Sequence, residues 1–223
     1  MGRGLIGCLI ALVVVVLIVG GWYVGVRNTL VGLDESVNQQ WAQVESQYQR
    51  RYDLIPNLVR TVQGAANFEK STLTEVVNAR ARVGQVQMPQ GAPGAAGALP
   101  NNEQGMQQFA AAQQGLSNAL SRLLVVVERY PDLKANQNFL ELQSQLEGTE
   151  NRIAVERQRY NQSAQQFNTA IRQFPANLVA SSGGFKAKAY FQGVPGSNQA
   201  PAVNFGPFGS APTATAPSTA TAP

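Results

Sequence analysis

The chain has 223 residues, of which only 13% are charged, and 17 Lys and Arg against 13 Asp and Glu give a formal net charge of +4. It contains no histidine and one cysteine, Cys8, which excludes His-dependent catalytic triads, His-based zinc sites, thiolate clusters and intramolecular disulfides. The basic residues are spread thinly, with no more than two adjacent, so nucleic acid is not an expected partner.

Residues 4–26 form an uncharged, strongly apolar run between Arg3 and Arg27. A helix over this run would be about 34 Å long, enough to cross a hydrocarbon core of about 30 Å. Trp22 and Tyr23 lie near its end, where aromatic rings favour the membrane interface. We therefore expect residues 1–27 to be a transmembrane anchor that contacts the lipid bilayer through residues 4–26.

Three other interpretations of this segment fit less well. A cleaved signal peptide would have a shorter apolar core, followed by a small-x-small site. The sequence LIGC before and at Cys8 is similar to a lipoprotein box, but here the apolar region follows the cysteine. Myristoylation of Gly2 would require Ser or Thr at the position of Ile6. Because one arginine flanks each side of the run, the orientation in the membrane stays open.

Two glycines in the anchor, Gly21 and Gly25, have the spacing that allows two membrane helices to approach closely. The alternative is an anchor that merely tolerates glycine and pairs with nothing.

A long helix is expected after the anchor, because apolar residues recur with spacings of three and four at Leu30, Leu33, Val37, Trp41, Val44, Tyr48, Tyr52, Ile55, Val59, Val62 and Ala66. The pattern stays in phase across Pro56, so we expect a kink near Tyr52 to Pro56 within one helix. The anchor and this helix are expected to form one nearly continuous rod. A turn is predicted at residues 64–67.

Three more segments show helical spacing or loop composition. A shorter helix is predicted over residues 68–86, with Leu73, Val76, Val77, Arg80 and Val83 on one face. Residues from about 88 to 105 are rich in Gly, Pro, Ala and Asn and are predicted to be a flexible loop. A third helix is predicted from about Glu103 to Tyr130, stopped by Pro131, with Phe109, Leu116, Leu120, Leu123, Val127 and Tyr130 buried.

The last predicted helix ends at Pro175. Its apolar face comprises Phe139, Leu142, Leu146, Thr149, Ile153, Tyr160, Ala164, Phe167, Ile171 and Phe174, interrupted by Glu156. We expect Arg152 or Arg159 to pair with Glu156. The aromatic residues Phe185, Tyr190 and Phe191 follow a glycine pair and are expected to pack back on the bundle. Residues 192–223 carry no charge and are predicted to be a disordered tail.

Long helices with one apolar face each must bury those faces against one another. The expected fold is therefore all-α, with an N-terminal transmembrane helix followed by an elongated antiparallel bundle over residues 28–191.

Several blocks of the chain are similar to the LemA family of membrane proteins. They are RRYDLIPNLV at residues 50–59, the block from LLVVVERYPDLKANQNFLELQ to AIRQFP at residues 123–175, and GFKAKAYF at residues 184–191. The resemblance implies a single-pass bacterial membrane protein with an antiparallel helical bundle, no established enzymatic activity and contacts with other envelope proteins. Asn67 stands where the family tends to have a histidine before Glu69.

Two groups of polar residues have more than one interpretation. Tyr160–Asn161 and Phe167–Asn168, with Asn57, Asn136, Asn138 and Asn151, would form either a polar groove for a ligand or partner helix, or interhelical hydrogen bonds that set the register. We favour the second. Charges near two predicted bends, Arg50, Arg51, Asp53, Glu128, Arg129 and Asp132, are expected to bridge helix ends rather than bind a cation. Glu147, Glu150 and Glu156, with Arg152, Arg157 and Arg159, are expected to form a solvated helix face.

The sequence and the resemblance thus predict a non-enzymatic role: an envelope scaffold or interaction module, self-associating or bound to other envelope proteins, in the cytoplasmic membrane of a bacterium. The alternative is an accessory or sensor subunit of an envelope enzyme such as a membrane protease. No catalytic residue, metal, cofactor or small-molecule substrate is predicted.

Overall fold

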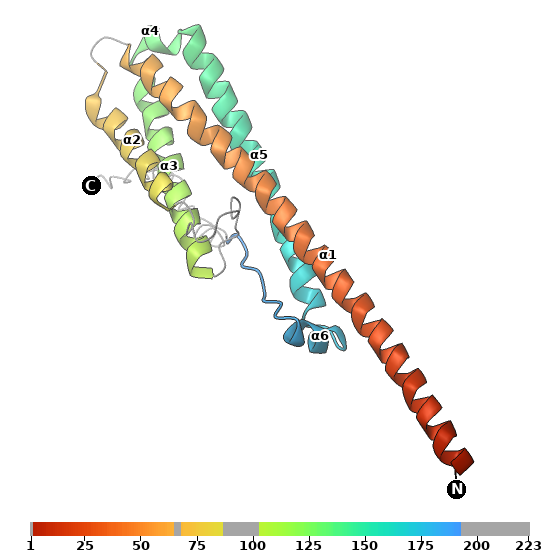
Figure 1. The fold of residues 1–223 in the computed structure, drawn as a ribbon. Coiled ribbons are helices and arrows are strands. Elements are labelled where there is room, and N and C mark those ends of the chain that lie inside the picture. Colours follow the sequence, from red (N-terminus) through yellow and green to blue (C-terminus); the bar gives the residue numbers. More distant parts are fainter. Residues whose placement is uncertain (1, 65–67, 87–102, 193–223) are drawn as a thin grey trace, which may run out of the picture. The chain divides into compact units, whose positions relative to one another are not determined.

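A computed structural model of the chain describes residues 2–64, 68–86 and 103–192 (Figure 1). Within these ranges there are six helices and no strand: α1 (Gly2–Gln63), α2 (Lys70–Gln85), α3 (Glu103–Val127), α4 (Pro131–Lys134), α5 (Gln137–Ala170) and α6 (Ala176–Ser182). The all-α prediction is confirmed. The predicted tail, residues 192–223, lies beyond the described residues except for Gln192, and most of the predicted loop also lies outside them. Helix α3 begins at Glu103, as predicted, so residues 103–105 belong to that helix and not to the loop.

The apolar run of residues 4–26 and the first bundle helix are one element, as predicted. Helix α1 has 62 residues and continues through Pro56 without a break, which makes it about 93 Å long. Its large apolar side chains from Ile6 to Val19 are exposed. Among the described residues it is the one helix long and apolar enough to cross a membrane.

Helices α1 and α5 lie side by side and run in opposite directions (Figure 1). Arg51 pairs with Glu150 at 2.7 Å between Nη1 and Oε2. The ring of Trp41, which precedes Arg51 in α1, packs against the ring of Tyr160, which follows Glu150 in α5. The residue numbers of the paired residues decrease along α1 as they increase along α5, which confirms the antiparallel arrangement.

Helices α2 and α3 form a second antiparallel pair. Arg122 Nη1 lies 2.7 Å from Glu75 Oε1, and Arg129 Nη2 lies 3.4 Å from Glu69 Oε2. The second ion pair joins the chain just before α2 to the chain just after α3. This is the bridge between helix ends that the sequence suggested for Arg129, although its partner was not foreseen.

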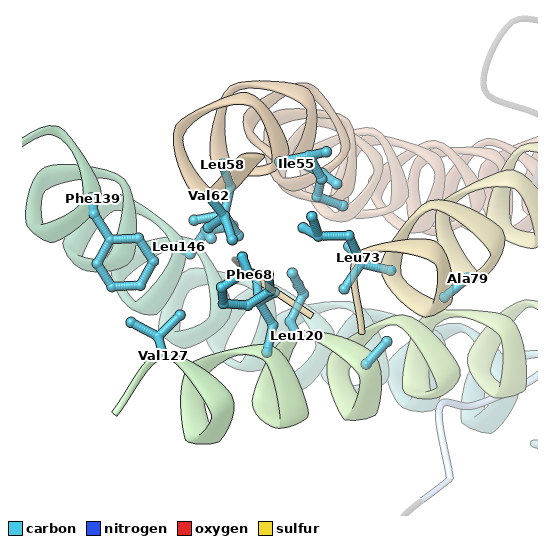
Figure 2. Packing of buried hydrophobic residues seen from close by; sticks show 14 of the residues in the cluster. Ile55, Leu58, Val62, Phe68, Leu73, Ala79, Leu120, Val127, Phe139 and Leu146 are labelled. Carbon is cyan, nitrogen blue, oxygen red and sulfur yellow. The ribbon is translucent and has the colours of Figure 1, made fainter. Parts of the chain in front are cut away.

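Two buried clusters hold these helices together. The first joins helices α1 to α5 and is shown in part in Figure 2; it includes Ile55, Leu58 and Val62 from α1, Leu73 and Ala79 from α2, Leu120 and Val127 from α3, Leu133 from α4, and Phe139 and Leu146 from α5. The second is aromatic and surrounds Trp41, whose ring centroid lies 5.6 Å from Phe109 and from Tyr160 and 5.8 Å from Phe191. Burial of these apolar faces is the main free-energy term that stabilises the bundle.

The predicted apolar faces are largely buried, except at Val77 and Phe174, and the prediction omitted one buried residue, Leu58. Val77 is exposed because it stands one residue, and hence about 100° around the helix, from buried Val76. Leu58 is fully buried although the predicted pattern omitted it. Phe174 is 80% exposed, not buried, since α5 ends at Ala170 and helical spacing no longer applies beyond that residue.

The structure also corrects two predicted helix ends: α3 ends at Val127 and not at Tyr130, and α5 ends at Ala170 and not at Pro175. Pro131 does not only stop a helix: it begins the short helix α4, where its missing N–H costs no helical hydrogen bond. The side chain of Asn136 then caps α5 by accepting hydrogen bonds from the backbone N–H groups of Asn138 and Phe139. Helix α6 was not predicted, because seven residues are too few for a periodic pattern.

Candidate functional site

The polar side chains buried in the bundle are the candidates for function, because burial of a polar group costs free energy unless the group is paired. In the described part of the chain the buried polar residues are Arg51, Thr72, Gln113, Thr149 and Asn168. Two of them, Arg51 and Asn168, organise networks that reach distant parts of the chain.

Arg51 of α1 connects three helices in what we call the Arg51 junction, formed by Arg51, Gln113, Ser117 and Glu150. Its Nη1 donates to Ser117 Oγ at 2.9 Å and to Glu150 Oε2 at 2.7 Å, and its Nη2 donates to Gln113 Oε1. Only 2% of the Arg51 side chain is exposed, against 53% of Glu150. The guanidinium is therefore buried, while its counter-charge stays in contact with water.

A tyrosine covers one side of this junction. The guanidinium carbon of Arg51 lies 5.2 Å from the centre of the Tyr48 ring, a distance at which a cation is attracted to a ring face. Burial raises the pKa of Tyr48 above its ordinary value, and the nearby Arg157 and Arg51 oppose only part of that rise. Tyr48 is therefore neutral at physiological pH and acts as packing around the charge.

A second arginine satisfies a backbone group that Pro56 leaves unpaired. Pro56 has no N–H, so the carbonyl of Tyr52, four residues earlier, lacks its usual helical donor. Arg80 Nε from α2 donates to that carbonyl at 3.4 Å, and the Arg80 guanidinium lies 3.8 Å from the centre of the Tyr52 ring. The proline thus leaves a free carbonyl acceptor on α1, to which Arg80 of α2 donates, and α1 continues past the proline.

Two asparagines of α5 hold the segment of residues 185–191 in what we call the Asn clamp. Asn168 Nδ2 donates to the carbonyl of Lys188 and its Oδ1 accepts the N–H of Lys188, both at 2.8 Å. Asn161 makes the same pair of contacts with Phe191, both at 2.9 Å. Tyr160 adds a hydrogen bond from its hydroxyl to the carbonyl of Ala189 at 2.9 Å.

The spacing explains why the clamp fits. Asn161 and Asn168 are seven residues apart on a helix, about 10.5 Å along its axis. Lys188 and Phe191 are three residues apart, which spans about 10 Å in an extended chain. Each asparagine therefore meets one residue of an extended segment. The sequence predicted a shared face for these amides, but the favoured interhelical partner was wrong: the partner is the chain's own non-helical segment.

The remaining predicted polar residues have local roles. Glu156 pairs with Arg159 at 2.8 Å, one of the two partners expected for it. Asp53 accepts a hydrogen bond from Gln49. Glu150 is exposed, as expected for a solvated face, but it pairs across helices with Arg51 and not within α5. Sequence spacing contained a signal for Arg51, since it lies three residues after Tyr48 and four before Ile55 and so shares their face.

An open pocket of about 560 Å³ lies at the end of the bundle that contains α4. Its lining includes Arg60, Arg129, Asp132, Asn136 and Asn138. Asn136 already caps α5 and Arg129 already pairs with Glu69, so two of these polar groups are occupied by structural contacts. The described residues contain no group of three or more His, Cys, Asp or Glu side chains suited to a metal ion.

Comparison with known protein families matches residues 40–205 to the LemA family. The chain belongs to the LemA family. The matched region contains the Arg51 junction, Pro56 and the Asn clamp, so the contacts described above lie within the family domain.

Among individual relatives of this LemA-family chain is magnetosome protein MamQ 2 of Paramagnetospirillum magneticum, which is 31% identical over 179 residues; the alignment covers 75% of this chain and 65% of that protein. Magnetosome protein MamQ of Magnetospirillum gryphiswaldense is 29% identical over 207 residues, covering 87% and 75%. Protein LemA of Metamycoplasma hominis is 24% identical over 170 residues, covering 76% and 70%. The chain thus spans about 65% of the length of the first of these relatives.

Family and fold together describe a helical protein of the LemA family whose first helix is long and apolar enough to cross a membrane. The names of the matched relatives refer to a magnetosome or to the family itself, and none of them states an enzymatic activity.

Proposed function

We propose that this LemA-family protein is a non-enzymatic scaffold of the bacterial envelope, anchored in the cytoplasmic membrane, which works through protein contacts and associates with itself. The proposal includes no nucleic acid, cofactor or small-molecule substrate.

The observation that carries the proposal is the continuity of α1. One helix contains both the apolar run of residues 4–26 and the residues Leu30 to Val62 that are buried against the rest of the bundle. Without a flexible hinge between anchor and bundle, the position of the anchor determines the position of the bundle. This geometry suits a protein that holds partners at the membrane.

The use of the buried polar groups supports a structural role. The guanidinium of Arg51 bonds to Gln113, Ser117 and Glu150. The amide of Asn168 is paired at both its nitrogen and its oxygen. The Nη atoms of Arg51 and the amide of Asn168 therefore stabilise the fold and are not free to bind a substrate, while the buried Nε of Arg51 has no partner among the described residues.

The anchor has an open glycine face that favours self-association. A Cβ atom added to Gly21 or Gly25 would meet nothing within 4 Å in the chain. The two glycines are four residues apart and so lie on one face of α1. A second copy of the helix would approach this face closely, as membrane helices with this spacing do.

Crosslinking through an introduced cysteine tests self-association. Asn28 is exposed and lies seven residues after Gly21, so it shares the glycine face just outside the apolar run. In a Cys8→Ser background, Asn28→Cys should form a disulfide-linked dimer when native membranes are oxidised. Gly21→Leu with Gly25→Leu should abolish that dimer, whereas Gly20→Leu, which points elsewhere, should retain it. Monomer in every variant would contradict self-association.

The alternative function is that of an accessory or sensor subunit of an envelope enzyme such as a membrane protease. It predicts that removal of this protein changes the turnover of other envelope proteins, whereas a purely structural scaffold changes their placement without changing their turnover. Pulse-chase measurement of envelope proteins with and without the chain separates the two.

A further inference from the structure

The segment between α5 and the glycine pair, residues 171–182, which we call the basal segment, lies beside the point where α1 leaves its apolar run. Tyr23 Oη and Ser182 Oγ are 3.1 Å apart, and Leu30 is buried together with Val179 and Ala180. Since the apolar run ends at Val26, these contacts place the basal segment at the level of the membrane boundary.

The pairing register of α1 and α5 independently places the end of α5 near the membrane boundary. The pairings of Arg51 with Glu150 and of Trp41 with Tyr160 follow one antiparallel register. Continued towards the N-terminus, that register sets Ala170, the last residue of α5, opposite Val31, five residues after the apolar run ends, so the basal segment begins close to this boundary. In Figure 1, α6 lies beside α1, which continues past it as a single helix.

Large apolar side chains of the basal segment face outward. Phe174 is 80% exposed and Leu178 is 59% exposed. Isolated apolar residues are common on protein surfaces. These two, however, belong to one short segment at the boundary level, where Trp22 of α1 is also exposed. Apolar and aromatic side chains at this depth are stabilised by contact with the acyl chains just below the headgroups.

The charge around the basal segment is positive. Arg172 and Lys186 are both exposed, and no Asp or Glu occurs anywhere after Glu156 in the sequence. Lys188 is paired with Asp34 at 2.7 Å, so it does not add to the free charge. Exposed cations at a membrane surface attract anionic lipid headgroups.

We propose that the basal segment is a second membrane contact, in which Phe174 and Leu178 insert into the boundary between headgroups and acyl chains of an anionic bilayer while Arg172 and Lys186 contact lipid phosphates. The bundle is then held at two points, α1 and the basal segment. With α1 as the single contact, the rigid unit of anchor and bundle could still rotate about the helix axis and tilt in the bilayer, whereas a second contact sets one face of the bundle towards the membrane. This contact does not depend on self-association.

Site-directed spin labelling of the full-length protein tests this. Labels are placed singly at Leu178→Cys and Phe174→Cys in a Cys8→Ser background, in vesicles of phosphatidylethanolamine and phosphatidylglycerol. Native Cys8, which is exposed within the apolar run, provides the lipid reference. Val125→Cys provides the water reference, because Val125 is 71% exposed near the end of α3 that pairs with the start of α2.

Collision rates with oxygen, which concentrates in lipid, and with a water-soluble nickel complex give the depth of each label. We expect the labels at residues 174 and 178 to show an oxygen-to-nickel ratio several-fold above that at residue 125 and closer to that at Cys8. A ratio equal to that at residue 125 would overturn the proposal. Shielding of the two labels from both reagents would also overturn it, because it would mean that protein covers the segment. A water-like ratio at Cys8 would overturn both this contact and the anchor, whereas loss of the Asn28 crosslink alone would leave this contact unaffected.

A second set of vesicles made of phosphatidylcholine isolates the role of charge. If Arg172 and Lys186 contact anionic headgroups, the ratio at residue 178 should fall in these neutral vesicles. An unchanged ratio would overturn the part of the proposal that concerns lipid charge.

Discussion

Arg51 carries a positive charge into the bundle, and its partner Glu150 stays half exposed. The two ends of this ion pair should therefore respond differently to mutation. Loss of Glu150 leaves a buried guanidinium without its counter-charge, whereas loss of Arg51 leaves a carboxylate that water can solvate.

We expect Glu150→Ala to lower the free energy of unfolding by about 3 kcal/mol, and Arg51→Met to lower it by less, although Arg51 is the buried residue. Exposed Glu147 on the same helix is the matched control, and Glu147→Ala should change stability by no more than about 0.5 kcal/mol. Chemical denaturation in detergent, followed by circular dichroism, measures all three. A larger loss for Arg51→Met than for Glu150→Ala would contradict the junction described here.

The buried hydroxyl of Tyr160 should make the free energy of unfolding depend on pH. Burial, with a smaller effect of Tyr190, raises the pKa of Tyr160 above its ordinary value. Above about pH 10 the unfolded tyrosine loses its proton while the folded one keeps it, so stability is present below that pH and falls as pH rises. In Tyr160→Phe this contribution is absent. The variant should be less stable than the natural protein at pH 8, and the difference should shrink between pH 10 and 12; a constant difference would contradict the argument.

At the scale of elements, the Asn clamp shows how a non-helical segment is held in an otherwise helical fold. Residues 185–191 form no helix, so their backbone groups need partners from elsewhere. Asn161 and Asn168 supply a donor and an acceptor each, and Phe185 and Phe191 pack into the aromatic cluster around Trp41. Hydrogen bonds and apolar contacts thus act on the same short segment.

Asn168→Ala should release this segment locally. Two backbone groups of Lys188 would lose their partners, at a cost of about 1–3 kcal/mol. Hydrogen exchange at the N–H of Lys188 should speed up accordingly, while exchange in the middle of α5 stays slow. Asn151→Ala, an exposed position on the same helix, is the control and should change neither rate. Unchanged exchange at Lys188 in Asn168→Ala would mean that the apolar contacts alone hold the segment.

At the scale of the whole molecule, the chain divides into one unit that ends at Phe191 and a second that begins at Gln192. Phe191 is buried against Trp41 and bound by Asn161, so the first unit is held to the bundle up to its last residue. The uncharged composition of residues 192–223 predicts that they contribute little to the stability of the bundle.

Deletion of residues 192–223 should therefore leave helicity and the melting temperature nearly unchanged. Deletion of residues 185–223 should lower the melting temperature strongly, because it also removes Phe185 and Phe191 from the aromatic cluster. Thermal melts of the two truncated proteins in the same detergent compare them directly. A large loss in the shorter deletion would show that the tail packs on the bundle.

Local pattern was sufficient for the four long helices, the candidate membrane span and the family. The spacing of three and four residues in α1 and α5 follows from helix geometry, and an uncharged run that spans a bilayer follows from transfer free energy. These properties belong to short stretches of chain, so they are readable without knowing the fold. The prediction failed at Phe174 for the same reason, because the pattern does not say where a helix stops.

Only the tertiary structure decided which polar groups meet. Arg51 lies 99 residues from Glu150 in the sequence, and Asn168 lies 20 residues from Lys188. Such partners depend on which helices become neighbours and in what register, and local periodicity is the same for many registers. The position of the basal segment beside Tyr23 was also decided by the tertiary structure. It depends on how much of α1 is covered by α5, and packing between the two helices sets that length.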